Sequence, residues 1–479
     1  MFVDRVEELA FLDQTLAFDR VHPASLVLLY GRRRVGKTHL LRHWAERTGL
    51  PSTYWAAEKE PAALQRRKLF ARVLNSNPTD PVAAASFESW DGLWQAVAAV
   101  FQDMPQGRIL ILDELPYAAE GDPAMLSSLQ HAWDQRFRDL RVAIVLCGSH
   151  VRAMETLMSR QSPLFGRLTG QWHLAPLPFS TLREFFPNWS AEERVAVYAI
   201  AGGVPAYLEW LKPRLSLVEN IRSVVLAKGG MFVAEPMFLL YDELREPSSY
   251  LAVLKAIGSG NHSLDAISNA CLMDKTNLAS YLARLQELRL VERRVPATVK
   301  PALRSKSRQG RYHLCDPYFR FYFRFLAPYQ DALAFDPEPA LAAVRDGLRA
   351  FVGQTVFEEL SREWVKAQGR QGKLPLKPSV VGSLWSRRTQ VDVVAVDWDA
   401  RCVLAGECKW GLDQVDRQVA RDLIETKLPL LRAELPDAGE GWTVIPALFA
   451  RSGVTAAARA EVQKHGGLLV DLGRMDREL

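Results

Sequence analysis

One short segment near the start of the chain combines glycine, lysine and threonine at the spacing that phosphate binding requires. Gly31, Gly36, Lys37 and Thr38 follow the apolar run Leu26–Tyr30. Glycines allow a tight turn in which several N–H groups point at one phosphate, and a helix beginning at Lys37 adds its positive dipole end. The lysine can reach the β and γ phosphates, and the threonine hydroxyl can bind Mg²⁺. The pattern predicts a binding loop for ATP or GTP; the alternative is a glycine-bearing turn without chemical meaning.

Polar side chains follow two further apolar runs. Asp113 and Glu114 end one of them, and we expect the aspartate to hold Mg²⁺ through water and the glutamate to act as the base for the attacking water. Ser149 ends the other and either senses the γ-phosphate through a hydrogen bond or simply terminates a strand. Arg167 is a candidate arginine finger, supplied within one subunit or by a neighbour, and an ordinary surface arginine is the alternative.

The composition is that of an ordinary globular protein. The chain has 479 residues, of which 48% are apolar and 24% charged, and this length suggests about three domains. It contains neither a long uncharged apolar run nor a signal-peptide pattern, so we expect a cytoplasmic protein without a membrane span. We expect the five scattered cysteines to be reduced thiols. A net charge of +5 is mild and neither requires nor excludes a polyanionic partner.

The first part of the chain must hold the phosphate loop on a sheet. Residues 1–210 alternate apolar runs with amphipathic stretches, which predicts a parallel sheet covered by helices and the start of a helical lid. Residues 211–245 are expected to form the rest of the lid or a linker. The clearest predicted strands are Leu26–Tyr30, Arg108–Asp113 and Val142–Gly148.

Residues 246–330 change pattern and predict a winged helix, which is three helices followed by a two-stranded hairpin. The expected helices are Ser248–Ile257, Leu264–Leu272 and Lys275–Leu288, and the expected strands are Leu290–Val295 and Arg311–Cys315. The following aromatic run, Tyr318–Phe325, is expected to be buried packing rather than a base-stacking surface.

Basic residues on the proposed wing and recognition helix favour duplex DNA as a partner. They suit phosphate contacts, and Asn277 can in principle read a base edge. In that case the affinity should fall steeply with salt. The alternative is a winged helix that binds protein or separates domains, with a merely solvated basic loop. The residues concerned are Lys275, Thr276, Asn277, Arg284, Lys300, Arg304, Lys306, Arg308 and Arg311.

A last predicted domain, residues 345–479, contains a second group of candidate chemical residues. A helix over Leu348–Gln368 should precede a hairpin of two strands, Gln390–Val396 and Cys402–Lys409. Alternate residues of a strand share a face, so Glu407 and Lys409 project together.

Asp392 can join this pair across the hairpin, and Glu358 on the helix can add a further carboxylate. Two carboxylates and a lysine can bind Mg²⁺ and position or deprotonate a water, which is what phosphodiester hydrolysis needs.

Several motifs together resemble the archaeal-type ATPase family, which belongs to the AAA+/STAND group of P-loop ATPases. The matching segments, spread over residues 1 to about 325, are 2–9, 31–38, 110–114, 147–149, 162–167 and 201–208. The resemblance implies ATP rather than GTP, a lid around 203–205, a sensor role for Ser149 and a γ-phosphate contact for Arg167. The nucleotide-binding residues expected on these grounds are Val3, Arg5, Gly31, Arg32, Arg33, Arg34, Val35, Gly36, Lys37, Thr38 and His39.

The order Glu358, Asp392, Glu407, Lys409 resembles the PD-(D/E)xK nuclease superfamily. Roughly residues 345–450 also resemble a domain often fused to archaeal-type ATPases. Val391 stands in place of the proline of the nuclease motif, a departure that leaves the chemistry intact. Nuclease-like folds can persist without activity, so a binding domain that does not cut is the alternative.

The predicted fold class is α/β, with a P-loop parallel sheet and helical lid, a winged-helix domain and a C-terminal α/β nuclease-like domain. The predicted function is that of an ATP-hydrolysing, DNA-binding protein that uses ATP and Mg²⁺ and cuts DNA under control of its nucleotide state. The alternatives are a nucleotide-controlled switch or scaffold with an inactive C-terminal domain, and a protein-binding ATPase. A homo-oligomer or protein partner stays open, because the arginine finger can come from a neighbour.

Overall fold

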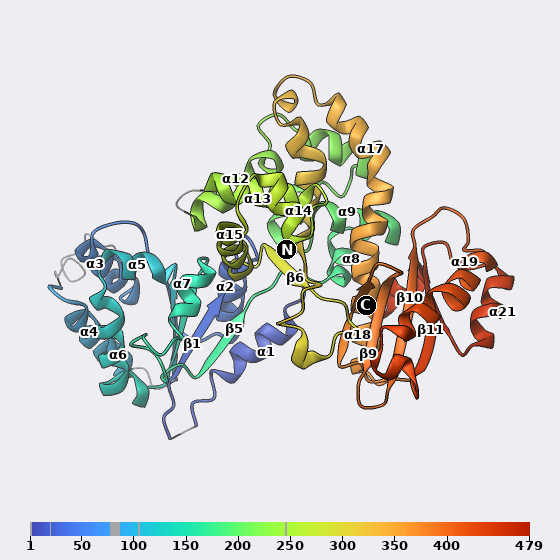
Figure 1. Cartoon of the computed structure of the whole chain (residues 1–479). Coiled ribbons are helices and arrows are strands. Elements are labelled where there is room, and N and C mark those ends of the chain that lie inside the picture. The colour runs from blue at the N-terminus through green and yellow to red at the C-terminus, as the bar shows by residue number, and fades with distance from the viewer. Residues whose placement is uncertain (1, 20, 77–86, 104–105, 245–246) are drawn as a thin grey trace. The chain divides into compact units, whose positions relative to one another are not determined.

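The computed structural model describes residues 2–19, 21–76, 87–103, 106–244 and 247–479. These residues divide into two compact units, coloured along the chain in Figure 1. The first unit comprises residues 1–177 with 204–206, and the second comprises 178–203 with 207–479. The division made from the sequence, into an ATPase domain, a lid or linker, a winged helix and a C-terminal domain, stays a prediction.

The first unit is built on a five-stranded parallel sheet with the strand order β2-β3-β4-β1-β5. Its strands are β1 (Ser25–Tyr30), β2 (Ser52–Ala56), β3 (Arg108–Asp113), β4 (Val142–Gly148) and β5 (Gly170–His173). The strands predicted at β1, β3 and β4 are confirmed, and every residue of the three is buried, as expected for a parallel sheet covered on both faces. Since β4 lies between β1 and β3, the carboxyl ends of these three strands meet at one edge.

Helices cover this sheet and bury alternate residues of each strand on opposite faces. Leu110 and Leu112 of β3 pack in a core with Trp94, whereas Ile109 and Ile111 pack in a second core with Trp44. The helices are α1 (Val6–Gln14), α2 (Lys37–Thr48), α3 (Ala62–Val73), α4 (Trp90–Gln102), α5 (Leu115–Gly121), α6 (Ala124–Gln135) and α7 (Val151–Thr156).

The second unit begins with the helical region expected for a lid. Its helices are α8 (Leu182–Phe185), α9 (Ala191–Ala201), α10 (Pro205–Trp210), α11 (Leu217–Asn220) and α12 (Met231–Glu243), although the first two residues of α10 belong to the first unit. The capping box formed by Ser190 and Glu193 fixes the start of α9, because it satisfies backbone donors that the first turn leaves free.

The next elements follow the predicted order of three helices and a hairpin, with ends within one residue of the predicted ones. They are α13 (Pro247–Gly258), α14 (Leu264–Cys271), α15 (Lys275–Glu287), β6 (Val291–Arg294) and the antiparallel β7 (Arg311–Leu314). The aromatic run over α16 (Pro317–Phe321) and the π-helical segment Tyr322–Leu326 is buried, which confirms packing rather than an exposed stacking surface.

The C-terminal part contains a mixed five-stranded sheet with the order β12-β11-β10-β9-β8. Neighbouring strands are antiparallel from β8 to β10 and parallel from β10 to β12. The strands are β8 (Val380–Trp385), β9 (Gln390–Asp397), β10 (Cys402–Lys409), β11 (Thr443–Ala450) and β12 (Leu468–Asp471). The predicted hairpin is therefore confirmed as β9 and β10.

The predicted helix Leu348–Gln368 is part of a longer helical stretch, α17 (Glu338–Val352), the π-helical segment Gly353–Phe357 and α18 (Glu358–Arg370). The π-helical segment puts an extra residue into the turn immediately before Glu358. The remaining helices are α19 (Arg417–Arg421), α20 (Leu428–Ala433), α21 (Ala456–Lys464) and α22 (Leu472–Glu478).

Candidate functional site

The glycine-rich loop between β1 and α2 has the geometry of a phosphate cradle. A Cβ atom on Gly31 would lie 2.4 Å from the carbonyl oxygen of Leu174, and Gly36 has a φ of 94°, so both positions require glycine. Lys37 is buried, and its Nζ donates to the carbonyl oxygens of Gly31 at 2.8 Å and Arg32 at 3.1 Å. The lysine predicted to meet phosphate thus lies within the loop.

The end of β3 meets the start of α2 through a carboxylate. The Thr38 hydroxyl donates to Oδ2 of Asp113 at 3.0 Å, so the two residues predicted to hold Mg²⁺ are adjacent. Tyr54 donates its hydroxyl proton to the same carboxylate oxygen. Burial, and then the negative charge of Asp113, raise the pKa of Tyr54 well above its ordinary value, so the phenol stays a donor. Sequence reasoning missed Tyr54 because β2 was not among the predicted strands.

The predicted base and the predicted sensor contact each other. Glu114 has left-handed backbone angles, φ 49° and ψ 39°, just before α5. The backbone N–H of Ser149 donates to Glu114 Oε2 at 3.1 Å, and the serine hydroxyl donates to Oε1. A non-glycine residue in this conformation costs free energy, and such strain is often found at functional positions.

The N-terminal segment is tied to the loop by an arginine. The Arg5 guanidinium is buried and donates to the carbonyl oxygens of Val35 at 2.9 Å and Ala175 at 2.8 Å. Val3 is also buried, and the Phe2 ring lies edge-on to the exposed His39.

The arginines of the loop differ in exposure. Arg33 is exposed, whereas Arg32 and Arg34 are half-buried. Arg167 is held elsewhere: its Nε and Nη2 contact the two carboxylate oxygens of Asp134 at 3.0 and 2.8 Å. Its role as an arginine finger therefore stays a prediction.

The C-terminal candidate residues meet across β9 and β10. Gly406 pairs with Val393, so the next residues outward, Glu407 and Asp392, face each other. The N–H of Cys408 donates to Asp392 Oδ2 at 3.0 Å, and Lys409 Nζ lies 3.3 Å from Glu407 Oε2. Strand alternation predicted this grouping.

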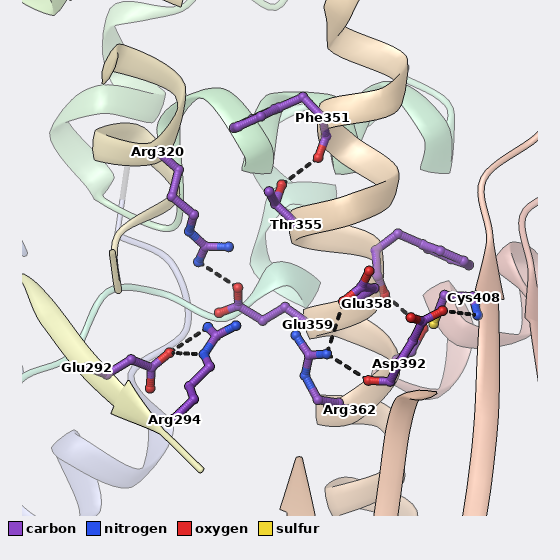
Figure 2. Close-up of polar contacts among 12 residues, drawn as sticks. Glu292, Arg294, Arg320, Phe351, Thr355, Glu358, Glu359, Arg362, Asp392 and Cys408 are labelled. Atoms are coloured by element: carbon purple, nitrogen blue, oxygen red, sulfur yellow. Dashed lines mark hydrogen bonds and ion pairs between the residues drawn. The ribbon is translucent and has the colours of Figure 1, made fainter. Parts of the chain in front are cut away.

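Glu358 approaches the same group from α18 (Figure 2). Burial, followed by the negative charge of Asp392, raises the pKa of its carboxyl to about 7. Burial and Asp392 also raise the pKa of Glu407. Within the described ranges, however, no three or more His, Cys, Asp or Glu side chains gather closely enough to hold a metal ion. A metal set that includes all three carboxylates stays a prediction.

Two cations that sequence reasoning missed hold these carboxylates. Arg362 Nη1 lies 3.3 Å from Glu358 and also donates to the carbonyl oxygen of Asp392 at 2.9 Å (Figure 2). Lys427 Nζ lies 2.7 Å from Glu407 Oε1. The i, i+4 spacing of Glu358 and Arg362 was a usable signal, whereas nothing local marks Lys427.

Several basic residues proposed for DNA contact are engaged within the protein. Arg304 donates to the carbonyl oxygens of Val295 and Pro296, Lys275 pairs with Asp265, and Arg284 pairs with Glu287. The Asn277 amide donates to Asp274. Among the others, Thr276, Lys300, Lys306 and Arg308 are exposed.

A glycine-rich loop after β1 and an aspartate at the end of β3 define a P-loop ATPase domain of the Walker type. Residues 2–211 match a family described as an ATPase domain predominantly from Archaea, and residues 322–421 match a family described as archaeal and bacterial proteins of unknown function. An uncharacterized protein of Methanocaldococcus jannaschii is 31% identical over 425 residues, which are 88% of this chain and 90% of that protein. The chain belongs to the family of this protein, with an archaeal-type ATPase domain followed by the second matched domain.

Two further similarities concern the ATPase part. An uncharacterized ATP-binding protein of the same organism is 50% identical over 46 residues, 10% of this chain and 73% of that protein. The solved structure of a Walker-type ATPase of Pyrococcus abyssi is 20% identical, with a TM-score of 0.51, and the match covers 67% of this chain and 96% of that one. This likeness shows a shared fold. Across the described residues, no helix is both long and apolar enough to cross a membrane.

Proposed function

We propose that the chain binds and hydrolyses ATP at the loop 31–38. Gly31 and Gly36 leave room that a side chain would fill, which fits phosphates approaching the loop backbone. Thr38 and Asp113 would hold Mg²⁺, which supplies positive charge to the phosphates when bound. Glu114 would orient the attacking water and accept its proton.

The observation that carries this proposal is the meeting of three strand ends. Thr38 follows β1, Asp113 ends β3 and Ser149 follows β4, and hydrogen bonds join Thr38 to Asp113 and Ser149 to Glu114. A carboxylate pair after a buried strand is common, but here it also contacts the threonine that follows a glycine loop and the end of a third strand, which is the arrangement that phosphate hydrolysis uses.

The experiment compares two variants of the full chain. Lys37→Ala should weaken ATP binding, because the phosphates lose their cation. Glu114→Gln should still bind ATP but turn it over about 10²–10⁴ times more slowly, since a carboxamide cannot act as a base. ATP binding by fluorescence and phosphate release would be measured together. Wild-type turnover by Glu114→Gln would refute the assigned base.

We further propose that the C-terminal domain is a Mg²⁺-dependent nuclease acting on DNA held by the segment α13 to β7. Mg²⁺ in proteins is often bound by only one or two carboxylates, with waters and substrate phosphates completing its shell. Asp392 and Glu407, which face each other, are therefore a sufficient donor pair. Lys409 is 42% exposed and would reach a substrate phosphate or water.

Ion pairs within the second unit support control of cutting by the nucleotide. Arg194 of α9 pairs with Asp476 of α22 at 2.8 Å, and Arg183 lies 3.4 Å from the same carboxylate. The lid helices are thus held to the C-terminal domain. Residues 204–206, which follow α9, belong to the first unit, where Pro205 approaches Gly36. Nucleotide binding at the loop would therefore act on the segment that follows α9 and leads into α10.

DNA cutting would be tested on linear, circular and single-stranded substrates with Mg²⁺. Lys409→Ala should abolish cutting, whereas Lys464→Ala, which removes an exposed lysine from α21, should cut as wild type does. Cutting that persists in Lys409→Ala would refute the assigned site.

A second candidate function is a nucleotide-controlled switch whose C-terminal domain binds without cutting. The ion pairs of Glu407 with Lys427 and of Glu358 with Arg362 favour it, because they occupy carboxylates that a nuclease needs. No cutting on any substrate by a preparation that hydrolyses ATP would support this function over the first.

A further inference from the structure

A cavity of about 630 Å³ within the second unit adjoins the C-terminal carboxylates. Its walls come from the end of α13 and the loop after it, the hairpin β6 and β7, residues within 320–324 and 347–362, and the strands β8 and β9. Ligand sites commonly have volumes of roughly 300–1,000 Å³, so the space suits one nucleotide-sized group. Asp392 and Glu358 lie in its lining.

The lining is rich in arginine. Three of these cations already have carboxylate partners: Arg294 pairs with Glu292, Arg320 with Glu359 and Arg362 with Glu358 (Figure 2). The other lining arginines among the described residues, Arg311 and Arg324, have no carboxylate partner in those ranges. The cavity therefore offers two guanidinium groups for an anion, and guanidinium suits phosphate recognition.

An aromatic ring stands beside one of these arginines. The Arg311 guanidinium lies 5.1 Å from the centre of the Trp385 ring, which also lines the cavity. Trp385 Nε1 donates to the carbonyl oxygen of Gln309 at 3.1 Å, which fixes the ring. Aromatic rings next to a basic groove are the usual means of holding the bases of single-stranded nucleic acid.

The hairpin wall is fixed to the sheet, so the cavity is preformed. Ala297, in the loop between β6 and β7, is fully buried in the core of the C-terminal sheet, and its N–H donates to the carbonyl oxygen of Ser383 at 2.9 Å. His262 and His313 stack with ring centres 4.2 Å apart beside this wall. Burial, then the charge of Arg294, lowers the pKa of His313 to about 2, consistent with a positive potential in the cavity.

We infer that this cavity binds one nucleotide unit of a single nucleic-acid strand, with its phosphate on Arg311 and Arg324 and its base near Trp385. The inference rests on the proposed nuclease function and adds the path of the substrate. A free nucleotide offers the same chemistry, but the strand is favoured because Asp392 lies in the same lining, where a phosphodiester would reach the proposed cutting site.

The test is strand binding without metal, so that no cutting occurs. A fluorescent single-stranded oligonucleotide would be titrated in EDTA at several salt concentrations, with the phosphate loop saturated by ADP. The double variant Arg311→Ala/Arg324→Ala should lower the slope of log affinity against log salt by about 0.7, because the two arginines share one phosphate and each phosphate neutralised on a single strand contributes about 0.7. Arg459→Ala, which removes an exposed arginine from α21, is the matched control and should keep the wild-type slope.

Two further measurements distinguish lost phosphate contacts from misfolding, and a bound strand from a bound free nucleotide. Arg311→Lys/Arg324→Lys keeps both charges and should restore most of the slope, which distinguishes lost contacts from misfolding. Unlabelled dTMP should compete poorly; strong competition by dTMP that the double variant abolishes would identify a free nucleotide as the occupant and overturn the strand. An unchanged slope in the double variant would overturn the cavity site altogether.

Strand binding and DNA cutting together distinguish failure of the nuclease proposal from failure of the cavity assignment. If wild type binds the strand through these arginines but never cuts DNA with Mg²⁺, the nuclease proposal fails and the binding cavity stands. If Lys409-dependent cutting occurs while the salt slope is unaffected by the double variant, the cavity assignment alone fails.

Discussion

The two candidate sites differ in what holds their carboxylates. At the phosphate loop, Asp113 and Glu114 accept hydrogen bonds from the hydroxyls of Thr38, Tyr54 and Ser149. In the C-terminal domain, the carboxylates form ion pairs with cations instead, as Glu407 does with Lys427. A neutral hydroxyl exchanges for water or a metal ion at little cost, whereas an ion pair must be separated first. The first site is therefore ready for its ligands, and binding at the second competes with internal ion pairs.

The largest effect that tests this difference is expected from removing the cation at the second site. Lys427→Met leaves the nearly buried Glu407 carboxylate without its 2.7 Å partner, so the C-terminal domain should lose about 1–3 kcal/mol of stability. Thermal melting followed by circular dichroism would measure this loss. The double variant Glu407→Gln/Lys427→Met, which removes both charges, should recover most of it. A wild-type melting curve for Lys427→Met would show that the pair is not what holds Glu407.

A smaller effect should appear in the dependence of stability on pH. Burial, and then the negative charge of Glu359, raise the pKa of the Glu363 carboxyl from 4.5 to about 7. The folded chain therefore keeps a proton that the unfolded chain releases, and the stabilisation present below pH 4.5 is lost as the pH rises through about 7.

The free energy of unfolding of Glu363→Gln should consequently match that of wild type near pH 4.5 and exceed it near pH 8 by on the order of 1 kcal/mol, once solvent screening is allowed for. Melting curves over this pH range would measure the difference. A constant difference at all pH values would contradict titration of Glu363 as its cause.

The smallest effect concerns the hydroxyl contacts of the first site. Tyr54→Phe removes one donor to Asp113 while Thr38 still donates. ATP turnover should therefore fall only about threefold, which corresponds to the low end of the free energy that a hydrogen bond contributes. Tyr241→Phe, at an exposed tyrosine of α12, is the control. A loss of more than a hundredfold in steady-state turnover would mean that the tyrosine takes part directly, and the two sites would then differ less than their contacts indicate.

The contrast between the two sites also explains which of their residues could be predicted from the sequence. β1, β3 and β4 are nearly continuously apolar and central in the sheet, so their ends and the residues that follow them were predictable. β2 is an edge strand whose residues alternate between exposed and buried, and it gives no such signal; Tyr54 was missed with it.

In the C-terminal domain, alternation along two neighbouring strands was enough to group Asp392 with Glu407 and Lys409. The partners of these groups come from distant elements. Lys427 reaches Glu407 from beyond the hairpin, and Arg167 meets Asp134 rather than the phosphate loop, because tertiary packing and not local pattern decides such contacts.

The most direct test of a nucleotide-controlled nuclease is the rate of DNA cutting by the full chain in Mg²⁺ without nucleotide, with ATP and with ADP. We expect the three rates to differ in wild type, and Glu114→Gln to keep the rate of the ATP state because it does not consume the nucleotide. Equal rates in all three states, or no cutting in any of them, would contradict the coupling of the two sites.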